Sequence, residues 1–137
     1  MVKLNKIYTR TGDDGTTGLV DGSRIAKSAP LMAAIGDIDE ANSAIGLAAA
    51  ALDAASEHGQ MIARIQNEMF DLGADLATPP DIQFGFGPHD MALRIVPSQI
   101  ARIEDEIDRM NDDLDALKSF ILPGGTEAAA RLHLARA

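Results

Sequence analysis

Residues 31–56, LMAAIGDIDEANSAIGLAAAALDAAS, repeat large apolar side chains every three or four positions. These side chains are Leu31, Ile35, Ile38, Ile45 and Leu52. That spacing places them on one face of a helix, and the alanines in the second half of the stretch favour helix. Pro30 precedes it, and proline is tolerated in a first turn. We therefore predict an amphipathic helix over residues 31–56.

Helices with the same spacing are predicted further along the chain. One follows a break at His58–Gly59 and ends at Thr78-Pro79-Pro80. Residues 78–96 then form a connection rich in Pro, Gly and Phe, and a loop of that length is usually functional or mobile. A third helix spans Pro97–Leu114 with a solvated acidic outer face. After an apolar run over residues 119–125, Thr126 and Glu127 open a fourth helix.

This pattern predicts an all-α fold with one domain over residues 1–137. Residues 31–137 form an antiparallel, up-and-down helical bundle of the ferritin-like kind, and residues 1–30 form an irregular glycine-rich arm. The fourth helix stops at Ala137 without a glycine, a proline or a polar tail. We expect this last helix to be truncated and further C-terminal helices to be missing from the chain.

Composition excludes several classes of protein. The absence of cysteine excludes disulfides and thiolate metal sites. There is no apolar leader and no stretch of membrane-spanning length, so we expect a cytoplasmic protein without a membrane partner. The net charge of −9 argues against nucleic acid as a partner. The first 30 residues nevertheless hold five basic and three acidic side chains, which favours a small polyanion at this end.

Residues 9–19, TRTGDDGTTGL, are the strongest candidate for a binding site. Glycine allows close approach of the backbone to a ligand, and threonine hydroxyls, backbone N–H groups and a guanidinium can surround an anion. The stretch matches neither the Walker frame nor GxGxxG. A phosphate cradle and a simple hairpin with an Asp-Gly turn are both compatible with it.

The other polar and aromatic residues that are candidates for a functional site can each be interpreted in two ways. Asp37, Asp39 and Glu40 form either a cation site or an outer surface on which Asp39 pairs with an arginine. Asp71 and Asp75, four residues apart, are solvated acids or helix caps. The three histidines are too scattered for a metal site. Phe120 fills the core or faces a flat ligand.

Taken together, four motifs resemble the PduO-type ATP:cob(I)alamin adenosyltransferase family. They are residues 7–19 (IYTRTGDDGTTGL), 36–43 (GDIDEANS), 71–79 (DLGADLATP) and 120–126 (FILPGGT), followed by LHLAR at 132–136. The resemblance implies a homotrimer with active sites between subunits. It also implies transfer of the 5′-deoxyadenosyl group of ATP to the cobalt of a reduced cobalamin, with release of triphosphate.

The resemblance also implies roles for single residues. The ATP phosphates, with Mg²⁺, would be held by Thr9, Arg10, Thr11, Gly12, Thr17, Gly18 and Lys27. Phe120 would press on the lower face of the corrin and displace the axial base, so that cobalt can be reduced to Co(I). Asp39 and Arg136 would form a salt bridge across the subunit boundary. The motifs single out no ligands for Mg²⁺.

One departure from the family pattern limits these expectations. The family continues past the position of Ala137 into an arginine-rich segment and a later helix, and both contribute to ATP binding. We therefore expect the 137-residue chain by itself to have little or no activity. The alternative function is a non-catalytic, ATP- or corrinoid-binding helical module.

Overall fold

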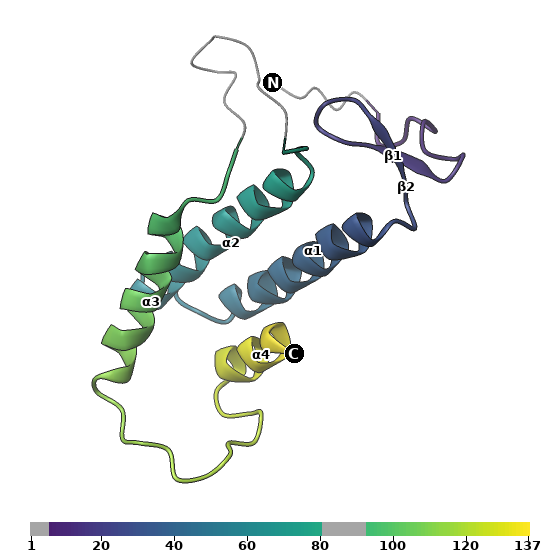
Figure 1. Cartoon of the computed structure of the whole chain (residues 1–137). Helices are drawn as coiled ribbons and strands as arrows, with labels where there is room; N and C mark the ends of the chain where they lie inside the picture. Colours follow the sequence, from purple (N-terminus) through teal and green to yellow (C-terminus); the bar gives the residue numbers. More distant parts are fainter. Residues whose placement is uncertain (1–5, 81–92) are drawn as a thin grey trace.

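The computed structural model describes residues 6–80 and 93–137. Four helices dominate it, and a small antiparallel hairpin precedes them (Figure 1). The elements are β1 (Thr16–Gly18), β2 (Arg24–Ala26), α1 (Pro30–Ala49), α2 (Glu57–Leu76), α3 (Pro97–Asn111) and α4 (Glu127–Arg136). The predicted all-helical bundle is confirmed. Residues 81–92, and with them most of the expected long connection and His89, lie outside the described residues.

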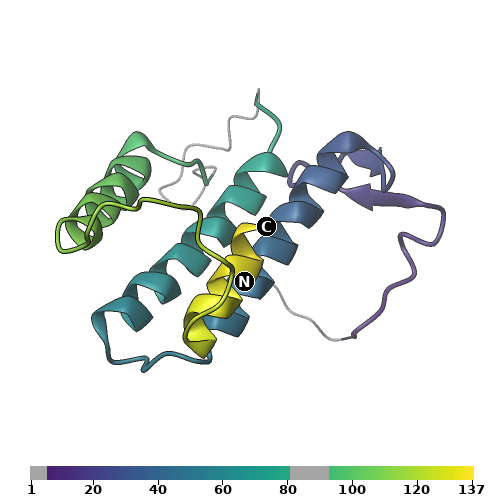
Figure 2. The same cartoon turned by 90° about the horizontal axis from the view of Figure 1, so that it is seen from below.

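Helices α1 and α2 form the centre of the molecule, lying side by side and antiparallel, and α4 packs on α1 (Figure 2). The small side chains of Ala48 on α1 and Ala128 on α4 are buried, which allows these helices to pack closely. Met61 of α2 is buried as well. A reciprocal pair of hydrogen bonds joins the two long helices, because the Asn42 and Gln66 side-chain amides each donate to the other residue's carbonyl. None of the described helices is long and apolar enough to span a membrane.

The boundary between α1 and α2 differs from the prediction. Helix α1 ends at Ala49, seven residues early, and the break lies at residues 50–56 instead of His58–Gly59. The Asp53 carboxylate accepts a hydrogen bond from the Ala55 N–H, and the Ser56 hydroxyl caps α2 by accepting from the Gly59 N–H at 3.1 Å. The local turn at Asp53 and the helix cap at Ser56 therefore override the helix propensity of the surrounding alanines.

Helix α3 is joined to α2 by ion pairs. Nη2 of Arg64 lies 2.5 and 2.6 Å from the two carboxylate oxygens of Glu106, Arg102 pairs with Glu68, and Arg109 with Glu57. The prediction that the acidic face of this helix is solvated is therefore wrong for Glu106, which is buried. The predicted C-terminus at Leu114 is also wrong, because the helix ends at Asn111.

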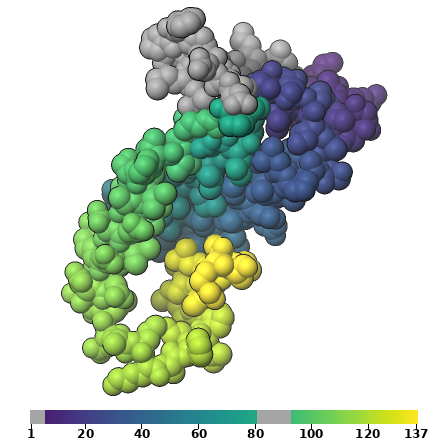
Figure 3. Space-filling model, in the orientation of Figure 1, coloured from purple at the N-terminus to yellow at the C-terminus, as the bar shows by residue number. Residues whose placement is uncertain are grey.

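The connection from α3 to α4 bulges away from the helices (Figure 3). Its apolar run stays in solvent, with Phe120, Ile121 and Leu122 all largely exposed. Helix α4 then begins where the sequence predicts, because the Thr126 hydroxyl accepts a hydrogen bond from the Ala129 N–H.

Candidate functional site

The glycine-rich arm is held in shape by two short carboxylate turns. Asp14 accepts from the N–H and hydroxyl of Thr16 at 2.9 and 2.8 Å, and Asp21 accepts from the same two groups of Ser23. These bonds favour the ionised carboxylates and lower the pKa of both aspartates. Gly22 follows Asp21 with a φ of 82°, a value that suits glycine. A hairpin is therefore present, but its Asp-Gly turn lies at residues 21–22, beyond the stretch 9–19 in which the sequence suggested it, and the Asp14–Gly15 pair does not form it.

A hairpin leaves room for the phosphate cradle, because residues 9–12 precede its strands. Arg10 has a φ of 61°, in the left-handed region that non-glycine residues rarely adopt. Its guanidinium lies 5.4 Å from the centre of the Tyr8 ring. Left-handed residues at turns help successive N–H groups converge on an anion. Lys6, Tyr8, Thr9 and Arg10 together line an open pocket on the surface of the arm.

The structure brings Gly12 and Lys27 into contact. The Lys27 N–H donates to the Gly15 carbonyl at 2.9 Å, and this bond folds the segment after β2 back onto the turn. A Cβ atom on Gly12 would lie only 3.0 Å from Nζ of Lys27. The hydroxyls of Thr9 and Thr11 are 2.9 Å apart on the same turn. Thus Thr9, Thr11 and Gly12 lie on one turn, and the exposed Lys27 from the segment after β2 adds a positive charge beside it.

Arg24 braces this turn, and the sequence analysis missed that role. Its Nη2 donates to the Thr11 carbonyl at 2.6 Å and to the Thr16 hydroxyl at 2.6 Å. Nη2 also lies 3.6 Å from the Asp14 carboxylate. Arg24 is only one of five basic residues among the first 30, so no signal in the sequence distinguished it. Thr17 and Gly18 lie on β1, where they pair with Ile25 and Arg24 of β2.

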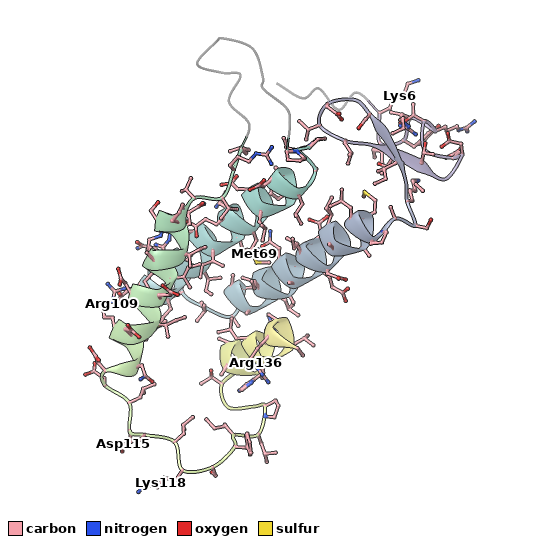
Figure 4. The ribbon with its side chains drawn as sticks, viewed as in Figure 1. Lys6, Met69, Arg109, Asp115, Lys118 and Arg136 are labelled. Carbon is pink, nitrogen blue, oxygen red and sulfur yellow. The ribbon has the colours of Figure 1, made fainter. Side chains whose placement is uncertain are left out.

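The structure does not bring the other predicted residues to the arm. Phe120 is fully exposed in the connection before α4, which Figure 1 places at the opposite end of the α1–α2 pair from the hairpin. Arg136 lies on α4, well away from Lys6 at the start of the described arm (Figure 4). Within one chain, therefore, the candidate phosphate cradle and the candidate corrin-facing residue are separate.

Asp39 and Arg136 do not pair within the described part of the chain. Asp39 lines an open pocket between α1 and α2 together with Asn42, Ser43, Gln66 and Phe70. Asp37 and Glu40 lie instead in the hollow between α1 and the end of α4. Asp39 thus belongs to a different helix face from its acidic neighbours. None of the described residues forms a group of three or more His, Cys, Asp or Glu side chains placed to hold a metal ion.

Asp75 was interpreted as solvated or as a cap, and the structure shows it bound at the end of α2. Its Oδ1 lies 2.6 Å from Nη1 of Arg94, and its Oδ2 accepts from the Ile95 N–H at 2.8 Å. The bond from Ile95 and then the guanidinium of Arg94 lower the pKa of this carboxyl. Nothing in the spacing of Asp71 and Asp75 indicated this partner nineteen residues away.

The chain was compared with known proteins. Residues 7–137 match the family Cobalamin adenosyltransferase. A corrinoid adenosyltransferase from Mycobacterium tuberculosis is 50% identical over 135 residues, 98% of this chain and 68% of the relative. A cobalamin adenosyltransferase from Cupriavidus metallidurans is 42% identical over 134 residues, 98% of this chain and 67% of the relative.

Solved structures agree with these relatives. A variant PduO-type ATP:corrinoid adenosyltransferase from Lactobacillus reuteri, complexed with cobalamin and ATP, superimposes with a TM-score of 0.80 at 34% identity. The match covers 96% of this chain and 70% of that one. A second variant of the Lactobacillus reuteri enzyme, complexed with ATP, gives a TM-score of 0.77 at 37% identity, over 95% of this chain and 70% of that one. Because the family match spans residues 7–137 and the fold superimposes on the solved enzymes over most of the chain, this chain belongs to the cobalamin adenosyltransferase family.

Proposed function

We propose that this protein transfers the 5′-deoxyadenosyl group of ATP to the cobalt of a reduced corrinoid, cob(I)alamin, and releases triphosphate. The observation that carries the proposal is the family match over residues 7–137. The relative complexed with both cobalamin and ATP supports the two substrates. The chemistry also fits a chain that offers no cysteine nucleophile.

The reaction needs no nucleophile from the protein. The electron pair of Co(I) attacks C5′ of the ribose, the C5′–O bond breaks, and triphosphate leaves with the bonding electrons. The corrinoid substrate thus supplies the difficult chemistry, and the protein supplies orientation and charge stabilisation. Cationic groups near the leaving triphosphate lower the barrier because negative charge grows there.

The exposed turn of the arm is the proposed phosphate site. Gly12 brings the backbone close to the anion, the Thr9 and Thr11 hydroxyls donate to phosphate oxygens, and Arg10 and Lys27 neutralise charge. Thr17 and Gly18 extend this surface along β1. The contact between Gly12 and Lys27 supports the assignment, because it sets a flexible ammonium group beside a backbone without a side chain.

Mg²⁺ is proposed to arrive with ATP. Mg²⁺ is commonly bound by substrate phosphates, waters and one or two carboxylates, and Asp13 is exposed on the same turn. A complete protein cage is not needed, which fits the lack of a metal-binding cluster among the described residues. The ion would help to neutralise the triphosphate. A cytoplasmic location is proposed because ATP is the substrate.

The corrinoid site is proposed to form between subunits of a homotrimer. Phe120 would contact the lower corrin face, and Asp39 of one subunit would pair with Arg136 of its neighbour. Two observations support this arrangement. Phe120 is fully exposed in the connection before α4, which lies at the opposite end of the α1–α2 pair from the hairpin (Figure 1). Asp39 and Arg136 are both exposed and unpaired with each other within the described chain.

The proposed function is tested by mixing the protein expressed from its gene with ATP and chemically reduced cobalamin. We expect the Co(I) absorbance to disappear and adenosylcobalamin and triphosphate to form in equal amounts. Binding of ATP without loss of Co(I) would favour the non-catalytic binding module. A protein that binds neither substrate would contradict both functions.

A further inference from the structure

Three segments of the chain meet at the C-terminal end of α2. The helix itself ends there, with Ala77 as its C-terminal cap. The segment before α3 arrives with Arg94 and Ile95, which bind the Asp75 carboxylate. The arm arrives with Val20, whose N–H donates to the Ala77 carbonyl at 3.1 Å. The end of α2 is therefore where the arm hydrogen-bonds to the helical body.

Arg94 supplies the positive charge that the end of this helix lacks. The last turn of α2 contains no basic residue, although its unpaired carbonyls favour a cation. The Arg94 guanidinium donates to the Thr78 carbonyl at 3.0 Å and to the Pro79 carbonyl at 2.9 Å. It also lies 3.2 Å from the Asp75 carbonyl. These bonds fix the backbone on both sides of Ala77.

The Asp75 carboxylate holds Arg94 in that position. One oxygen pairs with the guanidinium and the other accepts from the Ile95 N–H, so the carboxylate is bound through both oxygens. Its side chain is 23% exposed and that of Arg94 is 36% exposed. A partly shielded, doubly bonded pair is stronger than an ordinary surface ion pair.

Two attachments of the arm to the helical body are thus seen among residues 6–80 and 93–137. One is covalent, where the segment after β2 enters α1 at Pro30, and the other is the bond from Val20 to Ala77. We infer that the ion pair between Asp75 and Arg94 is a positioning element for the ATP-binding arm, acting through the Ala77 carbonyl. This inference rests on the proposed function of the arm. Neither Asp75 nor Arg94 is assigned a contact with substrate.

The inference is tested with Asp75→Asn in the protein expressed from its gene. Asparagine has the same shape but turns an amide N–H₂ toward one of two donors, so the pair breaks. We expect the KM for ATP to rise about tenfold, because small misplacements of binding groups are costly, and the KM for cobalamin to stay unchanged. Arg94→Gln should give the same result, and the double variant should be no worse than either single one.

Glu106→Gln is the matched control. The pair of Arg64 and Glu106 joins α2 to α3 itself, whereas Asp75 and Arg94 join α2 to the segment just before α3, and the Arg64–Glu106 pair is not bonded to any residue of the arm. We expect this variant to lose stability and to keep the wild-type KM for ATP. An equal rise of KM in Glu106→Gln and Asp75→Asn would overturn the inference, because the effect would then come from docking of α3. An unchanged KM in Asp75→Asn would also overturn it.

A second measurement does not depend on activity. Amide exchange of the Val20 N–H should accelerate about tenfold in Asp75→Asn and stay at the wild-type rate in Glu106→Gln. If the wild-type protein fails to adenosylate cobalamin, the proposed function fails while the exchange still tests the positioning role. If Val20 exchanges at the same rate in both variants and the wild type, Asp75 does not position the arm.

Discussion

Lys27 lies directly against Gly12: a Cβ atom at Gly12 would stand 3.0 Å from Nζ and 3.1 Å from Cε of Lys27. The same Cβ would be 2.9 Å from the Thr16 carbonyl oxygen. The lysine can move, but the backbone oxygen cannot move freely, because it accepts a bond from Arg24. The turn therefore leaves no room for a side chain at position 12.

Gly12→Ala should weaken ATP binding about tenfold, or ~1.4 kcal/mol, because the methyl group displaces the Lys27 ammonium and distorts the turn. Calorimetric titration with ATP measures the change. Gly36→Ala is the control, since a Cβ at Gly36 would meet nothing within 4 Å. Equal ATP affinities for wild type and Gly12→Ala would show that this turn does not form the phosphate site.

Phe120→Ala and Lys27→Ala should each impair a different step of the reaction. Phe120 is exposed in the connection before α4, and Figure 1 places this connection far from the hairpin of the arm. Its loss should therefore slow reduction of Co(II) to Co(I) on the protein and leave ATP affinity nearly intact. Lys27→Ala should weaken ATP binding and leave cobalt reduction unchanged. Spectra of the bound corrinoid follow the reduction, and titration follows ATP. A collapse of ATP binding in Phe120→Ala would contradict the role assigned to Phe120.

The sequence predicted those parts of the fold that depend on local signals. Pro97 and Thr126 mark the starts of α3 and α4, and the apolar spacing identified α1 and α2. The end of α1 was missed because the alanine-rich residues after Ala49 carry no stop signal. What ends the helix is the turn around Asp53, whose bonds to Ala55 and Ser56 were not foreseen.

The site was predictable only where a motif is continuous. The turn containing Gly12 follows from residues 9–19, whereas the role of Lys27 in it came from family resemblance and not from spacing. Arg24 and the pair formed by Asp75 and Arg94 were missed, because ion pairs between distant segments depend on how those segments pack. The charge pattern along one helix therefore does not identify such partners.

Glu106→Gln should lower the free energy of unfolding by about 2 kcal/mol, since Arg64 would keep a half-buried charge without its carboxylate. Replacing both residues, with Arg64→Met and Glu106→Leu, should restore most of this loss. Nε of Arg64 is buried without a partner, so the pair is incompletely satisfied and an apolar pair can match it. Urea unfolding measures both changes. A double variant that loses as much as both single variants combined would contradict this interpretation.

The pH dependence of stability should reveal the bound state of Asp75. Its pKa is lowered below the ordinary value of 3.8 by the Ile95 N–H and by Arg94, so folding favours the ionised form. The carboxylate therefore contributes stability above pH 3.8, and this contribution is lost as the pH falls through the lowered pKa.

The difference in unfolding free energy between wild type and Asp75→Asn should thus be constant from pH 7 to about 5 and shrink in stronger acid. Taking the difference removes the parallel titration of Asp14 and Asp21, whose pKa values are also lowered. A difference that grows in acid would mean that the folded state binds the protonated form of Asp75.

Gly59→Ala should destabilise the protein even though alanine is the better helix former. Gly59 is buried in the first turn of α2, and a Cβ there would lie 2.2 Å from the Asp53 carbonyl oxygen and 3.0 Å from Cα of Ala54. Both are backbone atoms of the turn that caps the helix, so relief requires the turn to move. Overpacking of this kind costs about 1–3 kcal/mol, more than the gain of ~1 kcal/mol in helix propensity.

Gly73→Ala is the control, because Gly73 lies in the same helix and nothing is within 4 Å of the new Cβ. This variant should instead gain up to about 1 kcal/mol of stability. Urea unfolding of both variants decides between packing and propensity: equal gains would mean that the turn at Asp53 yields freely and does not fix the start of α2.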